Sequence, residues 1–234
     1  MNAPQGEYWA VPGEGPEDVL LIGDVASPTL VTGLIDGRIV RTSNRGANWQ
    51  TVANTGGRPL GIEAAPDGGL IVCDAHEGLI WLHPKGSGYV PEVLVDRSSP
   101  FPAYLVNNAA VATDGTIYFS DSSSDIPVEQ FKADLLSGEA TGRLLRRSPD
   151  GTVDLIADGL RFANGVALNH DGSAVLVAQT GGYCVDRISL TGADAGSRTT
   201  LVDNLPGIPD NMSTGRNGVF WIALPSERSA MKSS

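Results

Sequence analysis

Residues 58–74 read Arg58-Pro-Leu-Gly-Ile-Glu-Ala-Ala-Pro-Asp-Gly-Gly-Leu-Ile-Val-Cys-Asp74, which is an apolar run, an Asp-Gly pair and a second apolar run. Asp-Gly pairs are typical of tight hairpin turns, because Gly enters the left-handed backbone region freely and Asp tolerates it. The stretch therefore predicts two antiparallel strands. The same pattern returns in residues 106–121, 162–178 and 210–223. The steps from Leu60 to Asn108, Asn108 to Gly165 and Gly165 to Met212 are 48, 57 and 47 residues.

A repeat of this length, with two outer strands after the inner pair, is typical of one four-stranded blade of a β-propeller. The sequence thus predicts a single all-β propeller domain over residues 1–234. Blade 1 would span about 17–52, and a fifth repeat begins at Asp210 and stops after two strands. We therefore expect about four and a half blades and a chain truncated at its C-terminal side. Residues 226–234 carry no strand pattern and are predicted to be disordered, and helical spacing is confined to residues 128–136.

The composition excludes several classes of function. There are 16 Lys and Arg against 27 Asp and Glu, a formal net charge of −11, whereas a nucleic-acid binder needs a basic face. No apolar run approaches the ~20 residues of a membrane span, and the N-terminus lacks the pattern of a secretion signal. We expect a cytoplasmic protein without a membrane span. Cys73 and Cys184 lie in apolar runs and are predicted to be buried free thiols.

Residues that precede the innermost strands surround the mouth of a propeller's central channel, where ligands bind. Here all of them are oxygen donors: Glu17 with Asp18 and the upstream Glu14, then Asn107, Asn108, Asn164, Asp210 and Asn211. Carboxylate and amide oxygens suit Ca²⁺, which takes about six to eight of them, and do not suit Zn²⁺. Glu17 and Asp210 would balance the charge of one divalent cation. The alternative is that these are ordinary turn residues.

Eight segments of the chain carry a family likeness: Gly-Pro-Glu17, Asp36-Gly-Arg-Ile-Val40, Gly57-Arg-Pro-Leu-Gly-Ile62, Asp74-Ala-His-Glu-Gly-Leu79, Tyr118-Phe-Ser-Asp-Ser-Ser-Ser124, Gly142-Arg-Leu-Leu145, Arg161-Phe-Ala-Asn-Gly-Val166 and Pro206-Gly-Ile-Pro-Asp-Asn211. In this order they resemble the strictosidine synthase-like proteins, and most of all their adipocyte plasma membrane-associated type. The wider group includes gluconolactonases and paraoxonases. The resemblance covers residues from about 15 to 224.

The resemblance implies a six-bladed propeller with Ca²⁺ in its channel and, among the characterised hydrolases, the opening of lactones or cleavage of aryl esters. Carried over by position, the implied metal ligands are Glu17, Asn107, Asn164, Asp210 and Asn211. Glu14 is a rival for the first ligand, because Gly-Glu14-Gly-Pro also resembles the gluconolactonase opening. Asp18 and Asn108 stand where paraoxonases bind a second Ca²⁺, although an Asp is usual at the latter position.

Three residues depart from the pattern of the group. Leu60 stands where paraoxonases carry a proposed catalytic His. Gln179 replaces a usual Glu, which we interpret as the loss of a charge near the channel. His76 replaces a usual Tyr and is either a general base or, in the interpretation that we favour, a turn residue at the blade surface.

The sequence thus leads to one main hypothesis and two rivals. The main hypothesis is a Ca²⁺-dependent hydrolase of the lactonase or arylesterase type, acting on a small ester or lactone. Water would be activated by the metal or by one of the carboxylates, of which Asp210 is the best candidate. One rival is a metal-stabilised propeller that serves as a scaffold without chemistry. The other is a carbon–nitrogen lyase or synthase like the namesake of the strictosidine synthase-like group.

Overall fold

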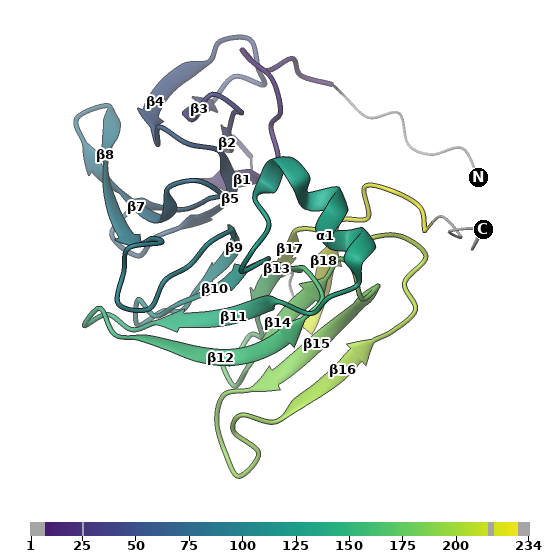
Figure 1. Cartoon of the computed structure of the whole chain (residues 1–234). Coiled ribbons are helices and arrows are strands. Elements are labelled where there is room, and N and C mark those ends of the chain that lie inside the picture. Colours follow the sequence, from purple (N-terminus) through teal and green to yellow (C-terminus); the bar gives the residue numbers. More distant parts are fainter. Residues whose placement is uncertain (1–7, 25, 215–217, 229–234) are drawn as a thin grey trace.

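The structure is a computed structural model that describes residues 8–24, 26–214 and 218–228 (Figure 1). The described residues form four four-stranded antiparallel sheets and one two-stranded sheet. In every sheet the strands follow one another in chain order, and the sheets are arranged around a common centre. The predicted all-β propeller is therefore confirmed, with four full blades.

The strands of blades 1 and 2 are β1 (Val19–Ile22), β2 (Thr29–Gly33), β3 (Arg38–Thr42), β4 (Gln50–Asn54), β5 (Pro59–Ala64), β6 (Leu70–Asp74), β7 (Gly78–Lys85) and β8 (Gly88–Val95). Those of blades 3 and 4 are β9 (Val106–Val111), β10 (Ile117–Asp121), β11 (Gly142–Arg147), β12 (Val153–Leu160), β13 (Ala163–Leu168), β14 (Ala174–Gln179), β15 (Cys184–Ser189) and β16 (Arg198–Val202). The two-stranded sheet consists of β17 (Met212–Thr214) and β18 (Phe220–Ile222).

The Asp-Gly pairs form the turns that the sequence predicts. Gly68 and Gly115 have φ angles of 81° and 88°, values that an L side chain rarely adopts. In each turn the Asp carboxylate accepts the backbone N–H two residues later, for example Asp114 from Thr116 at 2.9 Å. The side chain thus closes the turn that the Gly makes possible. Asn217, which belongs to a similar Asn-Gly pair, lies outside the described residues.

Apolar side chains fill the space between neighbouring blades. Their alternation along β10 shows how one strand serves two interfaces: Phe119 packs in the cluster shared with blade 2, and Tyr118 packs in the cluster shared with blade 4. Further clusters join blade 1 to blade 2 and blade 4 to the two-stranded sheet. Because the side chains of a strand point to opposite faces in turn, blades 2, 3 and 4 are each held on two sides.

In blades 2, 3 and 4 a buried polar side chain at the end of the second strand fixes the entry of the inner strand. Asp74 accepts the backbone N–H of Arg58 at 2.8 Å, and Asp121 accepts that of Leu105 at 2.7 Å. In blade 4 the side-chain oxygen of Gln179 accepts the N–H of Arg161 at 2.8 Å. The interpretation of Gln179 as a lost channel charge is therefore replaced by a structural role shared with the two Asp residues.

We expect Gln179→Glu to destabilise the fold increasingly as the pH rises. The Gln179 amide donates to the buried Asp186 carboxylate at 2.7 Å, so a second carboxylate there would lose this bond and repel its neighbour. Burial and repulsion raise the pKa of the new carboxyl above its unfolded value, so stability is lost as the pH rises through that interval. The loss of stability should be about 1–3 kcal/mol at neutral pH.

Thermal melts of the Gln179→Glu variant from pH 5 to 8 measure this loss. Gln50→Glu, on the exposed face of β4, is the control, and equal melting of both variants would contradict the expectation.

The helical spacing predicted at residues 128–136 is confirmed. A 3₁₀ turn, η1 (Val128–Gln130), leads into α1 (Phe131–Ser137), which ends at Gly138 with a φ of 70°. Figure 1 shows α1 across the centre of the ring, in front of the inner strands. The described residues contain no helix with the length and apolar composition needed to cross a membrane.

Cys73 and Cys184 are both free and buried, as predicted. At the C-terminal side, Glu227 pairs with Gly207, and the backbone N–H of Ile208 donates to the Ser226 carbonyl at 3.0 Å. The Arg228 guanidinium also lies 4.3 Å from the ring centre of Tyr183. Residues 226–228 are thus held against blade 4 and the segment before β17, and the rest of the predicted disordered tail lies outside the described residues.

Candidate metal centre at the channel cavity

The inner strands surround a cavity of about 260 Å³, here called the channel cavity. Its lining residues are Glu17, Arg58, Leu60, Asn107, Val128, Phe131, Leu135, Phe162, Asn164, Thr180, Ile208 and Asp210. They include four of the five residues proposed as metal ligands. The fifth, Asn211, contacts the same group, because its side-chain N–H donates to Glu17 Oε2 at 3.1 Å. Residues from every blade are therefore brought together at one place.

Hydrogen bonds between these side chains link neighbouring blades. Asn164 Nδ2 donates to Asp210 Oδ1 at 2.7 Å and to Thr180 Oγ1 at 3.1 Å. Thr180 in turn donates to the Pro209 carbonyl at 2.7 Å. The amide nitrogen of Asn164 is thereby fixed on one side, which leaves its oxygen to face the other way.

Two buried amide oxygens are left without partners. Asn107 Oδ1 and Asn164 Oδ1 accept no hydrogen bond from any described residue, although the side chains are only 5% and 4% exposed. A buried acceptor without a partner is unfavourable by about 1–3 kcal/mol, so its presence at both positions requires a reason. A bound cation would satisfy both oxygens. Within the described residues no three His, Cys, Asp or Glu side chains form a metal site, so any site here depends on the amides.

The carboxylates of the cavity are crowded. Burial, followed by the nearby Asp210 carboxylate, raises the pKa of Glu17 to about 8. Burial also raises the pKa of Asp210. Both shifts show that negative charge at this place is unfavourable in the protein alone. A divalent cation would reverse this, because it favours the ionised form of every oxygen ligand.

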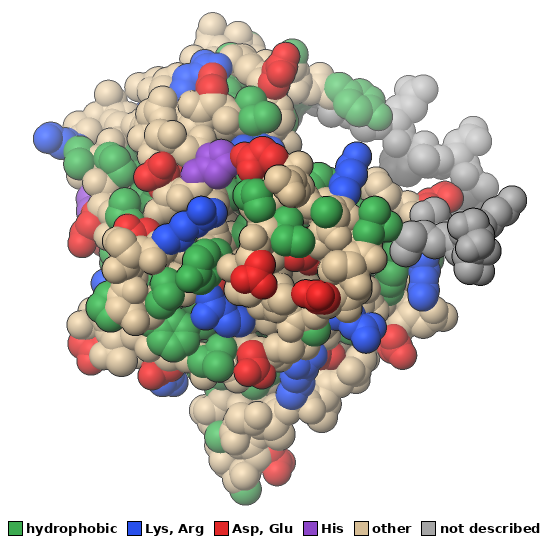
Figure 2. Space-filling model, in the orientation of Figure 1, with side chains coloured by type: hydrophobic (Ala, Val, Ile, Leu, Met, Phe, Trp, Pro, Cys, Tyr) green, Lys and Arg blue, Asp and Glu red, His purple; other side chains and the backbone are tan. Residues whose placement is uncertain are grey.

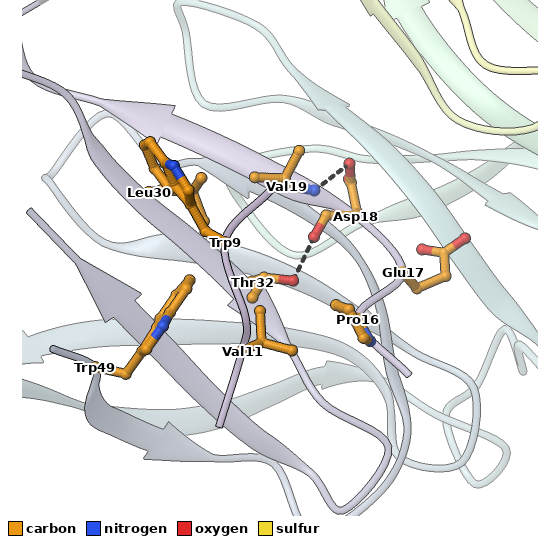
Figure 3. Close-up of a pocket in the computed structure, with 9 residues that line it drawn as sticks. All are labelled: Trp9, Val11, Pro16, Glu17, Asp18, Val19, Leu30, Thr32 and Trp49. Carbon is orange, nitrogen blue, oxygen red and sulfur yellow. Dashed lines mark hydrogen bonds between the residues drawn. The ribbon is translucent and has the colours of Figure 1, made fainter. Parts of the chain in front are cut away.

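Glu17 rather than Glu14 belongs to this group. The Glu14 side chain is exposed, and its backbone carbonyl accepts the N–H of Ile35 at 3.0 Å. Glu17 lines both the channel cavity and a second cavity of about 270 Å³ at blade 1, and Figure 3 shows its carboxylate turned away from Trp9 and Trp49 of that second cavity. The geometry therefore places Glu17 with Asn211 and the channel.

Asp18 and Asn108 connect blades through backbone contacts. Asp18 accepts the N–H of Ile62 in blade 2 at 3.1 Å and that of Val19 at 2.7 Å. Asn108 Oδ1 accepts the N–H of Val166 in blade 4 at 2.9 Å. The oxygens considered for a second Ca²⁺ are thus engaged in hydrogen bonds that hold the ring together.

A protein-family model described as "SMP-30/Gluconolactonase/LRE-like region" matches residues 30–232. The chain belongs to this family. Similar proteins include adipocyte plasma membrane-associated protein of Homo sapiens, 35% identical over 234 residues, and strictosidine synthase-like 6 of Arabidopsis thaliana, 34% identical over 216 residues. The resemblance found in the sequence is confirmed. These alignments cover 92% and 90% of this chain but 54% and 56% of the relatives, so the chain spans about half their length.

Solved structures show the same architecture. A gluconolactonase from Xanthomonas campestris has a TM-score of 0.67 at 22% identity, over 84% of this chain and 66% of that one. Regucalcin from Agrobacterium tumefaciens, described as a calcium-binding protein, has a TM-score of 0.65 at 16% identity, over 91% and 67%. At these identities the likeness shows the fold alone.

Two departures of this SMP-30/gluconolactonase/LRE-like chain can be placed in space. Leu60 lines the channel cavity where the paraoxonase-like pattern has a His. His76 does not line it, and instead its ring nitrogen lies 2.7 Å from Glu129 of η1, with both side chains exposed. His76 is therefore a contact between blade 2 and the helical segment.

Sequence reasoning missed the apolar half of the cavity. Val128, Phe131 and Leu135 were identified only by their helical spacing, and nothing in that spacing shows where the helix lies. Phe162 and Thr180 carried no signal of their own. Phe162 stands two residues before Asn164, however, so its place beside an inner strand could have marked it.

Proposed function

We propose that this chain forms a Ca²⁺-dependent hydrolase of the lactonase or arylesterase type, with its reaction centre in the channel cavity. The observation that carries the proposal is the set of oxygen ligands from Glu17, Asn107, Asn164 and Asp210, two of which are buried acceptors without partners. Membership of the SMP-30/gluconolactonase/LRE-like family supports it. The count of six blades, which the family resemblance implies, belongs to the same proposal. The chain itself spans about half the length of the relatives that it matches.

The donor set fits Ca²⁺. Glu17 and Asp210 contribute charge, Asn107 and Asn164 contribute neutral oxygens, and Asn211 holds Glu17 in place. When bound, Ca²⁺ supplies a positive charge for the carbonyl oxygen on which negative charge develops during attack.

Asp210 is the proposed general base. Its carboxylate takes a proton from the water that attacks the carbonyl carbon, and the ester bond breaks to give an acid and an alcohol, or one hydroxy acid from a lactone. Burial raises the pKa of this carboxylate in the protein without metal, and bound Ca²⁺ would lower it again. The hydrogen bond from Asn164 fixes its orientation at 2.7 Å.

One observation favours a scaffold without chemistry as the alternative. The described residues that line the channel cavity include no His, Ser or Cys, so neither a His-assisted water nor a Ser or Cys nucleophile is present there. The face of the molecule shown in Figure 2 gives no support to a nucleic-acid partner, because its Lys and Arg side chains are scattered among acidic ones. The cytoplasmic location stays a prediction, because similar proteins are named as plasma membrane-associated.

The proposed function is tested with a panel of lactones and aryl esters, each assayed in Ca²⁺ and in excess chelator. We expect turnover that disappears with chelator and returns when Ca²⁺ is added back. Stoichiometric Ca²⁺ binding without turnover of any compound would favour the scaffold. A condensation product from an amine and an aldehyde, detected by mass spectrometry, would favour the synthase.

A further inference from the structure

One side of the channel cavity is apolar. Half of its lining residues are aliphatic or aromatic: Leu60, Val128, Phe131, Leu135, Phe162 and Ile208. We call these six residues the apolar wall. Leu60 and Phe162 pack in one cluster with Val128 of η1 and Leu135 of α1. The helical segment therefore forms part of the wall. The wall and the proposed oxygen ligands line the same cavity.

Some hydrogen-bond donors among the polar lining groups are already engaged. The Asn164 amide nitrogen and the Thr180 hydroxyl are engaged with Asp210 and the Pro209 carbonyl. Arg58 donates through Nη1 to the Gly15 carbonyl at 2.7 Å. A sugar lactone carries several hydroxyl groups, and against the apolar wall these would lose water without gaining partners. The cavity is therefore poorly suited to a polyhydroxylated ligand.

Phe162 contributes to the wall from a backbone conformation that is unfavourable for an aromatic residue. Its φ is 56°, in the left-handed region that an aromatic residue rarely adopts and that is unfavourable by about 1–3 kcal/mol. The Phe162 carbonyl accepts the N–H of Thr180 at 3.1 Å, which holds this conformation, and the ring is 5% exposed. A large apolar side chain is thus placed directly before the inner strand that carries Asn164.

We propose that the channel cavity selects lactones or esters that carry an alkyl or aryl tail, which packs on the apolar wall, and that Leu135 of α1 is a specificity-determining residue. The identity of the reacting group rests on the proposed function. The preference for an apolar tail rests on the wall itself.

The first test compares δ-lactones of increasing alkyl tail length with glucono-δ-lactone, using the full chain in Ca²⁺. We expect kcat/KM to rise about three- to fourfold per methylene until the wall is covered, with glucono-δ-lactone the poorest substrate. Leu135→Ser should lower kcat/KM at least about tenfold for the longest tail and less than about twofold for the unsubstituted lactone. Leu136→Ser is the matched control, because Leu136 is the next residue of α1, is 64% exposed and does not line the cavity.

The second test does not depend on turnover. The corresponding δ-lactams resist hydrolysis, and their binding is measured by calorimetry with the same three proteins. Affinity that rises with tail length in the wild type and in Leu136→Ser, but is flat in Leu135→Ser, supports the proposal even if no lactone is hydrolysed. Hydrolysis that depends on Ca²⁺ but favours glucono-δ-lactone, or binding that does not change with tail length, would overturn the proposal and leave the hydrolase function standing.

Discussion

Replacing Asp210 by Asn is expected to lower hydrolysis of any accepted ester or lactone at least about a hundredfold. The same substitution should weaken Ca²⁺ binding about tenfold or more, because it removes one of two ligand charges. The side chain keeps its size, and its oxygen can still accept the hydrogen bond from Asn164. The loss therefore reports on charge and basicity rather than on packing. Steady-state kinetics and a Ca²⁺ titration measure the two effects.

The matched control for this variant is Asp194→Asn. Asp194 lies on an exposed loop between β15 and β16 and is not among the cavity residues. It should leave both activity and Ca²⁺ affinity unchanged. An Asp210→Asn protein with full activity would eliminate Asp210 as the base, and full Ca²⁺ affinity would eliminate it as a ligand.

Replacing Glu17 by Gln is expected to raise the stability of the chelated protein relative to the wild type and to reduce the stabilisation by Ca²⁺. In chelator at pH 8 the variant should melt at least about 3 °C above the wild type, which corresponds to about 1 kcal/mol for a chain of this size. In Ca²⁺ the wild type should gain stability and the variant should gain little. Thermal melts in the two conditions measure both effects.

The higher stability expected in chelator follows from the pKa of Glu17, which is raised from 4.5 to about 8 in the protein without metal. The protonated form is favoured there, so the stability that this group contributes is complete below about pH 4.5 and is lost as the pH rises towards 8. Gln remains neutral and escapes the loss. Glu14→Gln is the control, because Glu14 is exposed and outside the cavity; if it, and not Glu17→Gln, abolished the Ca²⁺ response, Glu14 would be the first ligand.

The fold could be read from the sequence because a propeller repeats. The Asp-Gly turns and the short apolar runs such as 70–74 recur at similar spacing, and each copy reinforces the next. The turns could be predicted from local chemistry alone, because the hydrogen bond of the Asp114 carboxylate and the positive φ of Gly115 both lie within three consecutive residues. The pairing of Glu227 with Gly207 was missed, because it depends on a partner 20 residues away and leaves no periodic pattern.

The polar half of the candidate site was also accessible from the sequence. Glu17, Asn107, Asn164 and Asp210 all stand at or just before the start of an inner strand, and the arrangement of the blades around a common centre brings such positions together. The apolar half was less accessible, because three of its six residues come from the helical insertion between β10 and β11, which has no counterpart in the other described blades. Gln179 was misread for a related reason: its partners, Arg161 and Asp186, are identified only by tertiary contacts.

The most direct test of a single Ca²⁺ site in the channel is a calorimetric titration of the chelated protein with Ca²⁺ at pH 7, compared with Asn107→Ala. We expect one equivalent to bind with release of about one proton, because Glu17 is mostly protonated at that pH in the absence of metal. Asn107→Ala, which removes a buried amide oxygen without a partner, should weaken binding about tenfold or more. Absence of binding, or equal affinity in the two proteins, would contradict the assignment of the channel oxygens as a calcium site.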